Sequence, residues 1–329
     1  MDVVVEMAES LEDYLEAWNS CMSHIHWFSD RRLMDWNRDE EIGEIKRDFD
    51  REGNHFLVAH RRNRDAAGVL GFRLQGEVGV IRGWEPGVPP QENDLAIGTS
   101  LLDECFRILM DQGVERVGCT LRFPIASPAV AEWHITLFNQ CGLKQWGPMG
   151  VQLILNLNDS QAYETHPEGV QVVNRSEYSV EEMVDLIHRA FTSKQEDRDT
   201  HAFDAGVTEP DAIRQLHERI MDGYYGLSPV EAWKVAVVDG EPVGFVGSFI
   251  PENPYRPQHG VLGPVGVLPE YRRQGVSTLL ISEVHSVLQE HGCIYSYVGT
   301  PETNHGALEM YQRIGFKPVF KVARFRRAF

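Results

Sequence analysis

The sequence lacks the features that mark secreted, disulfide-linked or membrane-spanning proteins. Its five cysteines are dispersed without a Cys-x-x-Cys pair, which predicts buried, reduced thiols in a reducing compartment. No apolar run approaches the roughly 20 residues that are needed to cross a bilayer. The start of the chain carries Asp2 and Glu6, where a signal peptide would carry basic residues. We therefore expect a cytoplasmic protein without a membrane partner.

Positive charge is also scarce. The 329 residues include only six lysines, and 49 acidic residues against 31 basic ones give a net charge of −18. A negative field along the whole chain argues against a nucleic-acid partner. It would attract a cationic acceptor such as an amine, although solubility is the simpler explanation. His24 and His26 form a His-x-His pair, but no further ligand has metal-site spacing, so we expect no metal.

The second half of the chain has the pattern of a mixed α/β domain. Helices are predicted at residues 179–191, 209–222, 275–291 and 304–314, between strands at 169–175, 232–238, 242–250, 260–268, 294–299 and 316–329. The first half repeats this order, with a hairpin at 56–74, a long helix at 94–112 and a last helix at 128–141. Each half therefore predicts a domain in which several strands are interleaved with helices.

The two halves keep a common register. Gly71 lies 173 positions before Gly244, and Gly113, which ends the long helix, lies 179 positions before Gly292. Offsets that recur over separate elements indicate a tandem duplication of one domain. We predict an N-terminal domain at 1–158, a linker at 159–168 and a C-terminal domain at 169–329.

The second half carries a glycine-containing run where a strand gives way to a helix. Backbone N–H groups at a helix start have no intrahelical partner, and the positive end of the helix dipole faces outward with them. Such a run can hold a diphosphate, and glycine lets the backbone approach closely. The run is Arg272-Arg273-Gln274-Gly275-Val276-Ser277, and a second motif follows at Asn304, Ala307, Tyr311, Gly315 and Phe316.

Together these motifs resemble the acyl-CoA N-acyltransferases of the GNAT superfamily, over essentially all of residues 169–329. The superfamily signature is Arg/Gln-x-x-Gly-x-Gly/Ala, and Ser277 departs from its last position. The resemblance implies two tandem GNAT-fold domains of α/β class, each with a central, mostly antiparallel twisted sheet flanked by helices. It also implies acetyl-CoA or coenzyme A as co-substrate. Duplicated chains are known in the superfamily, mycothiol synthase being one, and the resemblance does not imply its product.

The resemblance also implies roles for single residues. The strand before the loop separates from its neighbour, and its amides at Val265, Gly266 and Val267 pair with the pantetheine arm. Asn304 contacts the pantetheine, and Tyr311 is the general acid that protonates the leaving thiolate. Because these two residues are seven apart, they share a helical face. A core tyrosine is the alternative interpretation of Tyr311. The diphosphate is assigned to Arg272, Arg273, Gln274, Gly275, Val276 and Ser277.

The motifs do not fix the general base. Many family members place a glutamate on the fourth strand, but residues 260–268 contain no carboxylate. His259, at the strand entry, is the nearest titratable candidate and has a suitable ordinary pKa. Glu302, His305 and a water relay are alternatives. Residues 197–204 and 251–259 are expected to build the acceptor pocket.

The corresponding run of the first half has lost the key residues. Arg272 is matched by Asn93 and Gly275 by Ala96, while Asp94 would repel a diphosphate. Asn304 falls on Ala131, and Tyr311 falls on Phe138, which cannot donate a proton. We therefore predict a degenerate N-terminal domain without catalysis of its own, and leave open weak coenzyme A binding there.

The sequence as a whole predicts an acetyl-CoA-dependent N-acetyltransferase. Its acceptor is expected to be a small-molecule amine that attacks directly in a ternary complex in the C-terminal domain. A non-catalytic acyl-CoA-binding or interaction protein is one alternative, and an O-acyltransferase is another. Because one chain supplies two domains, a monomer is expected, with a dimer as the alternative.

Overall fold

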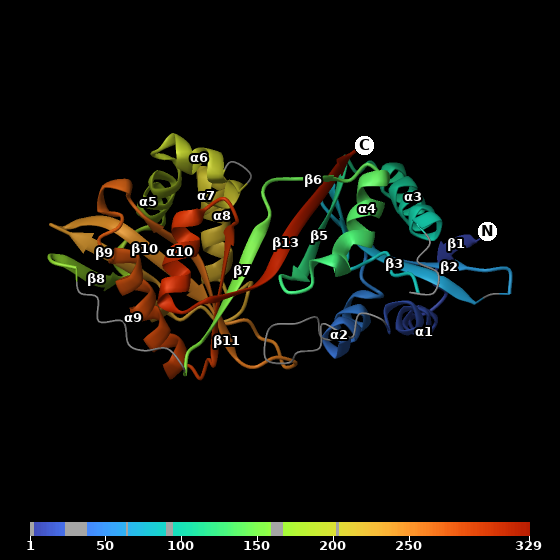
Figure 1. The fold of residues 1–329 in the computed structure, drawn as a ribbon, viewed down its shortest axis with the longest axis horizontal. Helices are drawn as coiled ribbons and strands as arrows, with labels where there is room; N and C mark the ends of the chain where they lie inside the picture. Colours follow the sequence, from blue (N-terminus) through green and yellow to red (C-terminus); the bar gives the residue numbers. More distant parts are fainter. Residues whose placement is uncertain (1–2, 24–37, 64, 90–94, 159–166, 202–203) are drawn as a thin grey trace. The chain divides into compact units, whose positions relative to one another are not determined.

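The computed structural model describes the chain except for residues 1–2, 24–37, 64, 90–94, 159–166 and 202–203. Two compact units are present (Figure 1). The first consists of Met1–Met149 with Phe320–Phe329, and the second of Gly150–Val319. No helix among the described residues is long and apolar enough to cross a membrane. All five cysteines are buried and free.

The first unit is built on one sheet. Its strands follow the order β1-β2-β3-β4-β5-β13, and every neighbouring pair is antiparallel except β4–β5, which is parallel. The elements are β1 (Val4–Met7), α1 (Leu11–Met22), α2 (Arg38–Asp48), β2 (Asn54–His60), β3 (Ala66–Gln75), β4 (Val78–Ile81), α3 (Leu95–Asp111), β5 (Arg116–Pro124), α4 (Glu132–Gln140), β6 (Lys144–Gln145) and β13 (Lys317–Ala328).

The second unit repeats this topology. Its strand order is β8-β9-β10-β11-β12-β7, and again only the fourth and fifth strands, β11 and β12, are a parallel pair. The elements are β7 (Gly150–Asn156), β8 (Val170–Asn174), α5 (Val180–Thr192), α6 (Gln195–His201), α7 (Ala205–Thr208), α8 (Pro210–Met221), β9 (Lys234–Val238), β10 (Glu241–Phe249), β11 (His259–Val267), α9 (Val276–Glu290), β12 (Tyr295–Pro301) and α10 (His305–Ile314).

Helices cover both faces of the sheet in the second unit. A side chain added at Gly244 of β10 would touch Val276 of α9, whereas one added at Gly266 of β11 would touch Ala190 of α5. Helix α5 begins with a capping box, in which Ser179 and Glu182 bond each other's backbone N–H groups. Its buried side chains pack on β9 and β10 around the fully buried Phe245.

The predicted fold class is therefore confirmed, down to the mostly antiparallel sheet in each copy. The two compact units do not coincide with the predicted domains 1–158 and 169–329. Each unit contains one strand segment from the other predicted domain. Strand β7, from the end of the first half, pairs with β12 in the second unit. The C-terminal residues 320–328 pair with β5 in the first unit, so dark red lies beside green in Figure 1. Most of the predicted linker lies outside the described residues.

Candidate active site

The parallel strands of the second unit separate partway along their length. Strands β11 and β12 pair from His259 opposite Tyr295 to Leu262 opposite Val298. Beyond that point β11 continues against β10 as far as Val267, while β12 continues against β7. The separation that the resemblance implied is therefore present, and it begins just before the predicted amides at 265–267.

The backbone of β11 has amides that point into this separation. The Leu268 N–H donates to the Val243 carbonyl of β10 at 2.8 Å. Because N–H groups alternate in direction along a strand, the Gly266 amide also faces β10. Those of Val265 and Val267 then face the other way, toward β12. Of the three predicted residues, Val265 and Val267 therefore offer backbone groups to a ligand arm between the strands.

The loop after β11 ends in a tight helix start. Gly275 has a φ of 86° in the left-handed region and is the N-cap of α9, a conformation that favours glycine. The first helical bond runs from the Leu279 N–H to the Gly275 carbonyl. The N–H groups of Val276, Ser277 and Thr278 precede it and have no intrahelical partner. These groups and the helix dipole form the predicted anion-binding end.

The two arginines of the loop differ in their surroundings. Arg273 is exposed. Arg272 is two-thirds buried, and its Nη1 contacts both carboxylate oxygens of Asp197 at 2.9 and 3.0 Å. Its Nε donates to the Val267 carbonyl at 2.9 Å and its Nη2 to the Ala190 carbonyl at 2.7 Å. The Gln274 side chain also bonds within the loop, to the Glu270 carbonyl.

The second motif is placed on helix α10. Asn304 is the N-cap, and its Oδ1 accepts from the Ala307 N–H at 3.2 Å. Its side-chain NH2 group is not used in that bond and can serve a ligand. Tyr311 is 4% exposed and packs edge-on against Phe316. Burial raises the pKa of Tyr311 well above its ordinary value, so the phenol keeps the proton that a general acid must donate.

The structure places His259 at the start of β11, at the paired end of the strand. Val265 is six residues further on, which corresponds to about 20 Å of extended strand. The imidazole is 2% exposed, contacts the Pro257 carbonyl at 2.9 Å and packs on Tyr297. Glu302 and His305 directly follow β12 at the separated end. The described geometry therefore favours these two over His259 as groups near the separated strands.

The same position in the first unit is filled by side chains. Strands β4 and β5 pair only from Val78 to Val80 and then separate. Trp84, just beyond β4, is 5% exposed, and its carbonyl lies 2.9 Å from His134 Nε2. The two rings meet edge-on at 5.3 Å, and Phe138 continues the stack from α4. Asn93 and Asp94 lie outside the described residues, and Gly98 packs closely on Leu137.

A buried carboxylate fixes this filled segment. Glu85 is 1% exposed and accepts hydrogen bonds from the Tyr14 hydroxyl, the Trp18 indole and the Gly71 N–H. Arg82 lies next to it, with Nε 3.8 Å from the carboxylate. Since all these partners point inward, we interpret Glu85 as a structural group that fastens α1 to the sheet.

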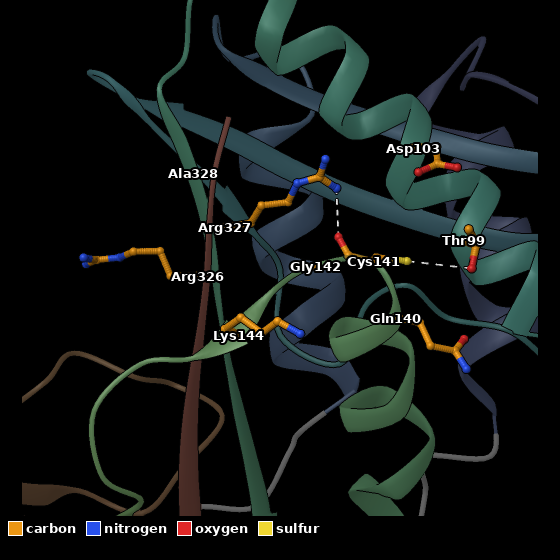
Figure 2. Close-up of a pocket in the computed structure, with 9 residues that line it drawn as sticks. All are labelled: Thr99, Asp103, Gln140, Cys141, Gly142, Lys144, Arg326, Arg327 and Ala328. Atoms are coloured by element: carbon orange, nitrogen blue, oxygen red, sulfur yellow. Dashed lines mark hydrogen bonds between the residues drawn. The ribbon is translucent and has the colours of Figure 1, made fainter.

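An open surface pocket in the first unit contains none of the predicted site residues (Figure 2). Its volume is about 550 Å³, and its walls come from α3, the end of α4, β6 and β13. Arg327 crosses it, donating to the Cys141 carbonyl at 2.8 Å and lying over the Phe106 ring. The lining carries three cationic side chains, Lys144, Arg326 and Arg327, and one carboxylate, Asp103.

In the part of the chain that the structure describes, no group of three or more His, Cys, Asp or Glu side chains is placed to hold a metal ion. His24 and His26 lie outside the described residues.

Comparison with known proteins finds a family to which the second half is similar. The acetyltransferase (GNAT) family pattern matches residues 182–316. The N-alpha-acetyltransferase of Saccharolobus solfataricus is 30% identical over 103 residues, which are 29% of this chain and 59% of that protein. The matched relatives are thus covered over about three fifths of their length. Residues 182–316 of the second half are therefore similar to the GNAT acetyltransferase family.

Solved structures extend the likeness of fold to the whole chain. A GCN5-related N-acetyltransferase from Sphaerobacter thermophilus superposes with a TM-score of 0.65 at 17% identity, covering 99% of this chain and 95% of that one. A tandem GNAT protein from the clavulanic acid biosynthesis pathway gives 0.57 at 16% identity, covering 99% and 98%. At these identities the likeness establishes the fold alone.

Some features of the site had no clear signal in the sequence. Asp197 is 75 positions from Arg272 and lies in a polar stretch that gave no sign of helix α6. The sequence carried only a weak indication that side chains fill the separation between β4 and β5 in the first unit. Bulky Trp84 and the Trp133-His134 pair stand where the second half has glycine and small residues.

Proposed function

We propose that the protein is an acetyl-CoA-dependent N-acetyltransferase with its active site in the second unit. The observation that carries the proposal is the separation of β11 from β12, directly before the α9 start, within the region that is similar to the GNAT acetyltransferase family. The amides of Val265 and Val267 bind the pantetheine arm between the strands. The N–H groups at the α9 start and the exposed Arg273 bind the diphosphate. Asn304 orients the pantetheine.

The reaction is a direct acyl transfer in a ternary complex. The amine nitrogen attacks the thioester carbonyl carbon, a C–N bond forms, and the C–S bond breaks. Tyr311 donates its proton to the departing thiolate. The proton of the attacking amine passes to Glu302, to His305 or to water, all of which the separated end of β12 can accommodate.

The acceptor is proposed to be a small-molecule amine, and the protein to act as a monomer. A negative net charge of −18 favours the approach of an ammonium group. Peptide α-amino groups are a second candidate, because two matched relatives are named N-alpha-acetyltransferases. Sedimentation velocity tests the monomer, and a stable dimer would contradict it.

An acceptor panel tests the activity. The purified chain is incubated with acetyl-CoA and with small amines, short peptides with free N-termini, and alcohols of matched size. Release of coenzyme A is followed with a thiol reagent, and the product is identified by mass. Acetylated amine supports the proposal, and acetylated alcohol supports O-acyl transfer instead. Tight acetyl-CoA binding without turnover on any acceptor would favour the non-catalytic alternative.

A further inference from the structure

Arg272 joins three elements of the second unit through one guanidinium. Its Nε bonds the last residue of β11, Val267, and its Nη2 bonds Ala190 near the end of α5. Its Nη1 bonds Asp197 in the first turn of α6. A planar fork with fixed donor directions suits such three-way bonding, and lysine could not reproduce it. To turn toward a diphosphate, the side chain would have to break all three sets of bonds.

Helix α6 depends on such contacts for its position. It has only seven residues, and a helix of this length is not stable without tertiary packing. Asp197 and His201 are four residues apart and share one face. His201 is 9% exposed, with its ring edge-on to Phe191 of α5 at 4.7 Å. One face of α6 is therefore held at two points, by Arg272 and by Phe191.

We propose that Arg272 is a positioning residue and not a ligand of the diphosphate. It fastens α6, on the expected acceptor side, to the edge of β11 that receives the pantetheine arm. The inference rests on the proposed function for the identity of the two substrates. Val267 is the point of connection, because its carbonyl accepts from Arg272 while its amide faces the separated strands. The α9 N–H groups and Arg273 are left to bind the diphosphate.

The experiment compares a donor that carries the diphosphate with one that does not. Affinities of acetyl-CoA and of acetyl-pantetheine, which lacks the diphosphate together with the 3′-phosphoadenosine, are measured by calorimetry for wild type and Arg272→Gln. A positioning role predicts the same loss with both donors, about tenfold, as expected for the loss of charged hydrogen bonds. A loss confined to acetyl-CoA would overturn the proposal. Arg272→Lys should resemble Arg272→Gln; wild-type affinity in the Lys variant would also overturn it.

The role of Asp197 is tested without turnover. Hydrogen exchange over α6 in the unliganded protein should rise about tenfold or more in Asp197→Asn, because a charged contact holding the helix is lost. Glu196→Gln is the matched control, since it removes an adjacent charge that does not bond Arg272, and should leave exchange unchanged. Equal exchange in both variants would contradict the proposal.

The two proposals can fail separately. If wild type binds neither donor, the proposed function fails, while α6 exchange still reports on positioning. With an acceptor from the panel, Asp197→Asn should raise the acceptor KM about tenfold with less than a twofold change in acetyl-CoA affinity. An unchanged acceptor KM would overturn the link between α6 and the acceptor side.

Discussion

The two units share a topology and differ in what occupies the separation between their fourth and fifth strands. In the second unit residues 263–266 are all partly exposed. A Cβ atom added at Gly263 or at Gly299 would have no other atom within 4 Å. In the first unit residues 84–88 are all buried, and Trp84 and His134 pack against each other there. The same strand geometry is thus open in one copy and filled in the other.

This difference separates the requirements of fold from those of a site. A fold needs its sheet order and core, and both copies have these. A site needs space and unused backbone groups, which reduce stability, so a copy released from that need gains by filling the space. In the first unit the Trp84 ring occupies the space, and the hydrogen bonds of Glu85 hold the same segment in place. We interpret the first unit as a structural domain.

The largest expected effect is on turnover. Tyr311→Phe should lower kcat by roughly 10²–10⁴-fold, the usual contribution of a general acid, because the departing thiolate loses its proton donor. Acetyl-CoA affinity should change less than about twofold, since only a hydroxyl is removed. Steady-state kinetics and calorimetry measure the two quantities.

The matched change in the first unit is Phe138→Tyr, which places a phenol at the corresponding position. It should add no activity to the Tyr311→Phe protein, because the neighbouring space is occupied by His134 and Trp84. Near-normal kcat in Tyr311→Phe would remove the catalytic role of Tyr311. Restored turnover in the Tyr311→Phe, Phe138→Tyr double variant would contradict the interpretation that only the second unit can be catalytic.

The next effect is on stability. Trp84→Ala should lower the free energy of unfolding of the first unit by about 3–5 kcal/mol, since a large buried side chain is lost and a cavity remains. Urea denaturation measures the change. Trp146→Ala is the control, because that ring is 36% exposed and lies under Arg326, and should cost about 1 kcal/mol or less.

Calorimetry on the folded Trp84→Ala protein sharpens the comparison. We expect it to bind one acetyl-CoA per chain, as the wild type should. Binding of a second equivalent of acetyl-CoA would mean that the Trp84 side chain alone prevents acetyl-CoA from binding to the first unit. A loss of stability no larger than that of Trp146→Ala would mean that Trp84 does not hold the segment.

The parts of the structure that depend on local pattern could be predicted from the sequence. Periodicity located the long helices, the register of glycines predicted that the two halves repeat one topology, and Gly275 marked the start of α9. Partners far apart in sequence were beyond such patterns. Alternation in residues 150–156 identifies a strand, but it does not say which sheet that strand joins. The Arg272–Asp197 pair likewise depends on a docking that neither local sequence encodes.

The smallest expected effect concerns pH and again distinguishes the units. Burial raises the pKa of Glu41, on α2 of the first unit, to about 7, with Arg82 acting in the opposite direction and Glu44 and Glu85 adding to the rise. Between pH 4.5 and 7 the folded chain keeps this proton while the unfolded chain releases it. The stabilisation is therefore complete below about pH 4.5 and is lost as the pH rises through 7.

The test is urea denaturation of the first unit across this pH range. Glu41→Gln should flatten the pH dependence and make the unit more stable than wild type at pH 7.5, by on the order of 2 kcal/mol. Glu52→Gln removes an exposed carboxylate of the same unit and should keep the wild-type slope. Equal slopes for wild type and Glu41→Gln would show that Glu41 loses its proton in the folded state as readily as in the unfolded one. Glu41 and Glu44, which lie near Arg82, would then be well solvated, whereas residues 84–88, which follow β4, are buried.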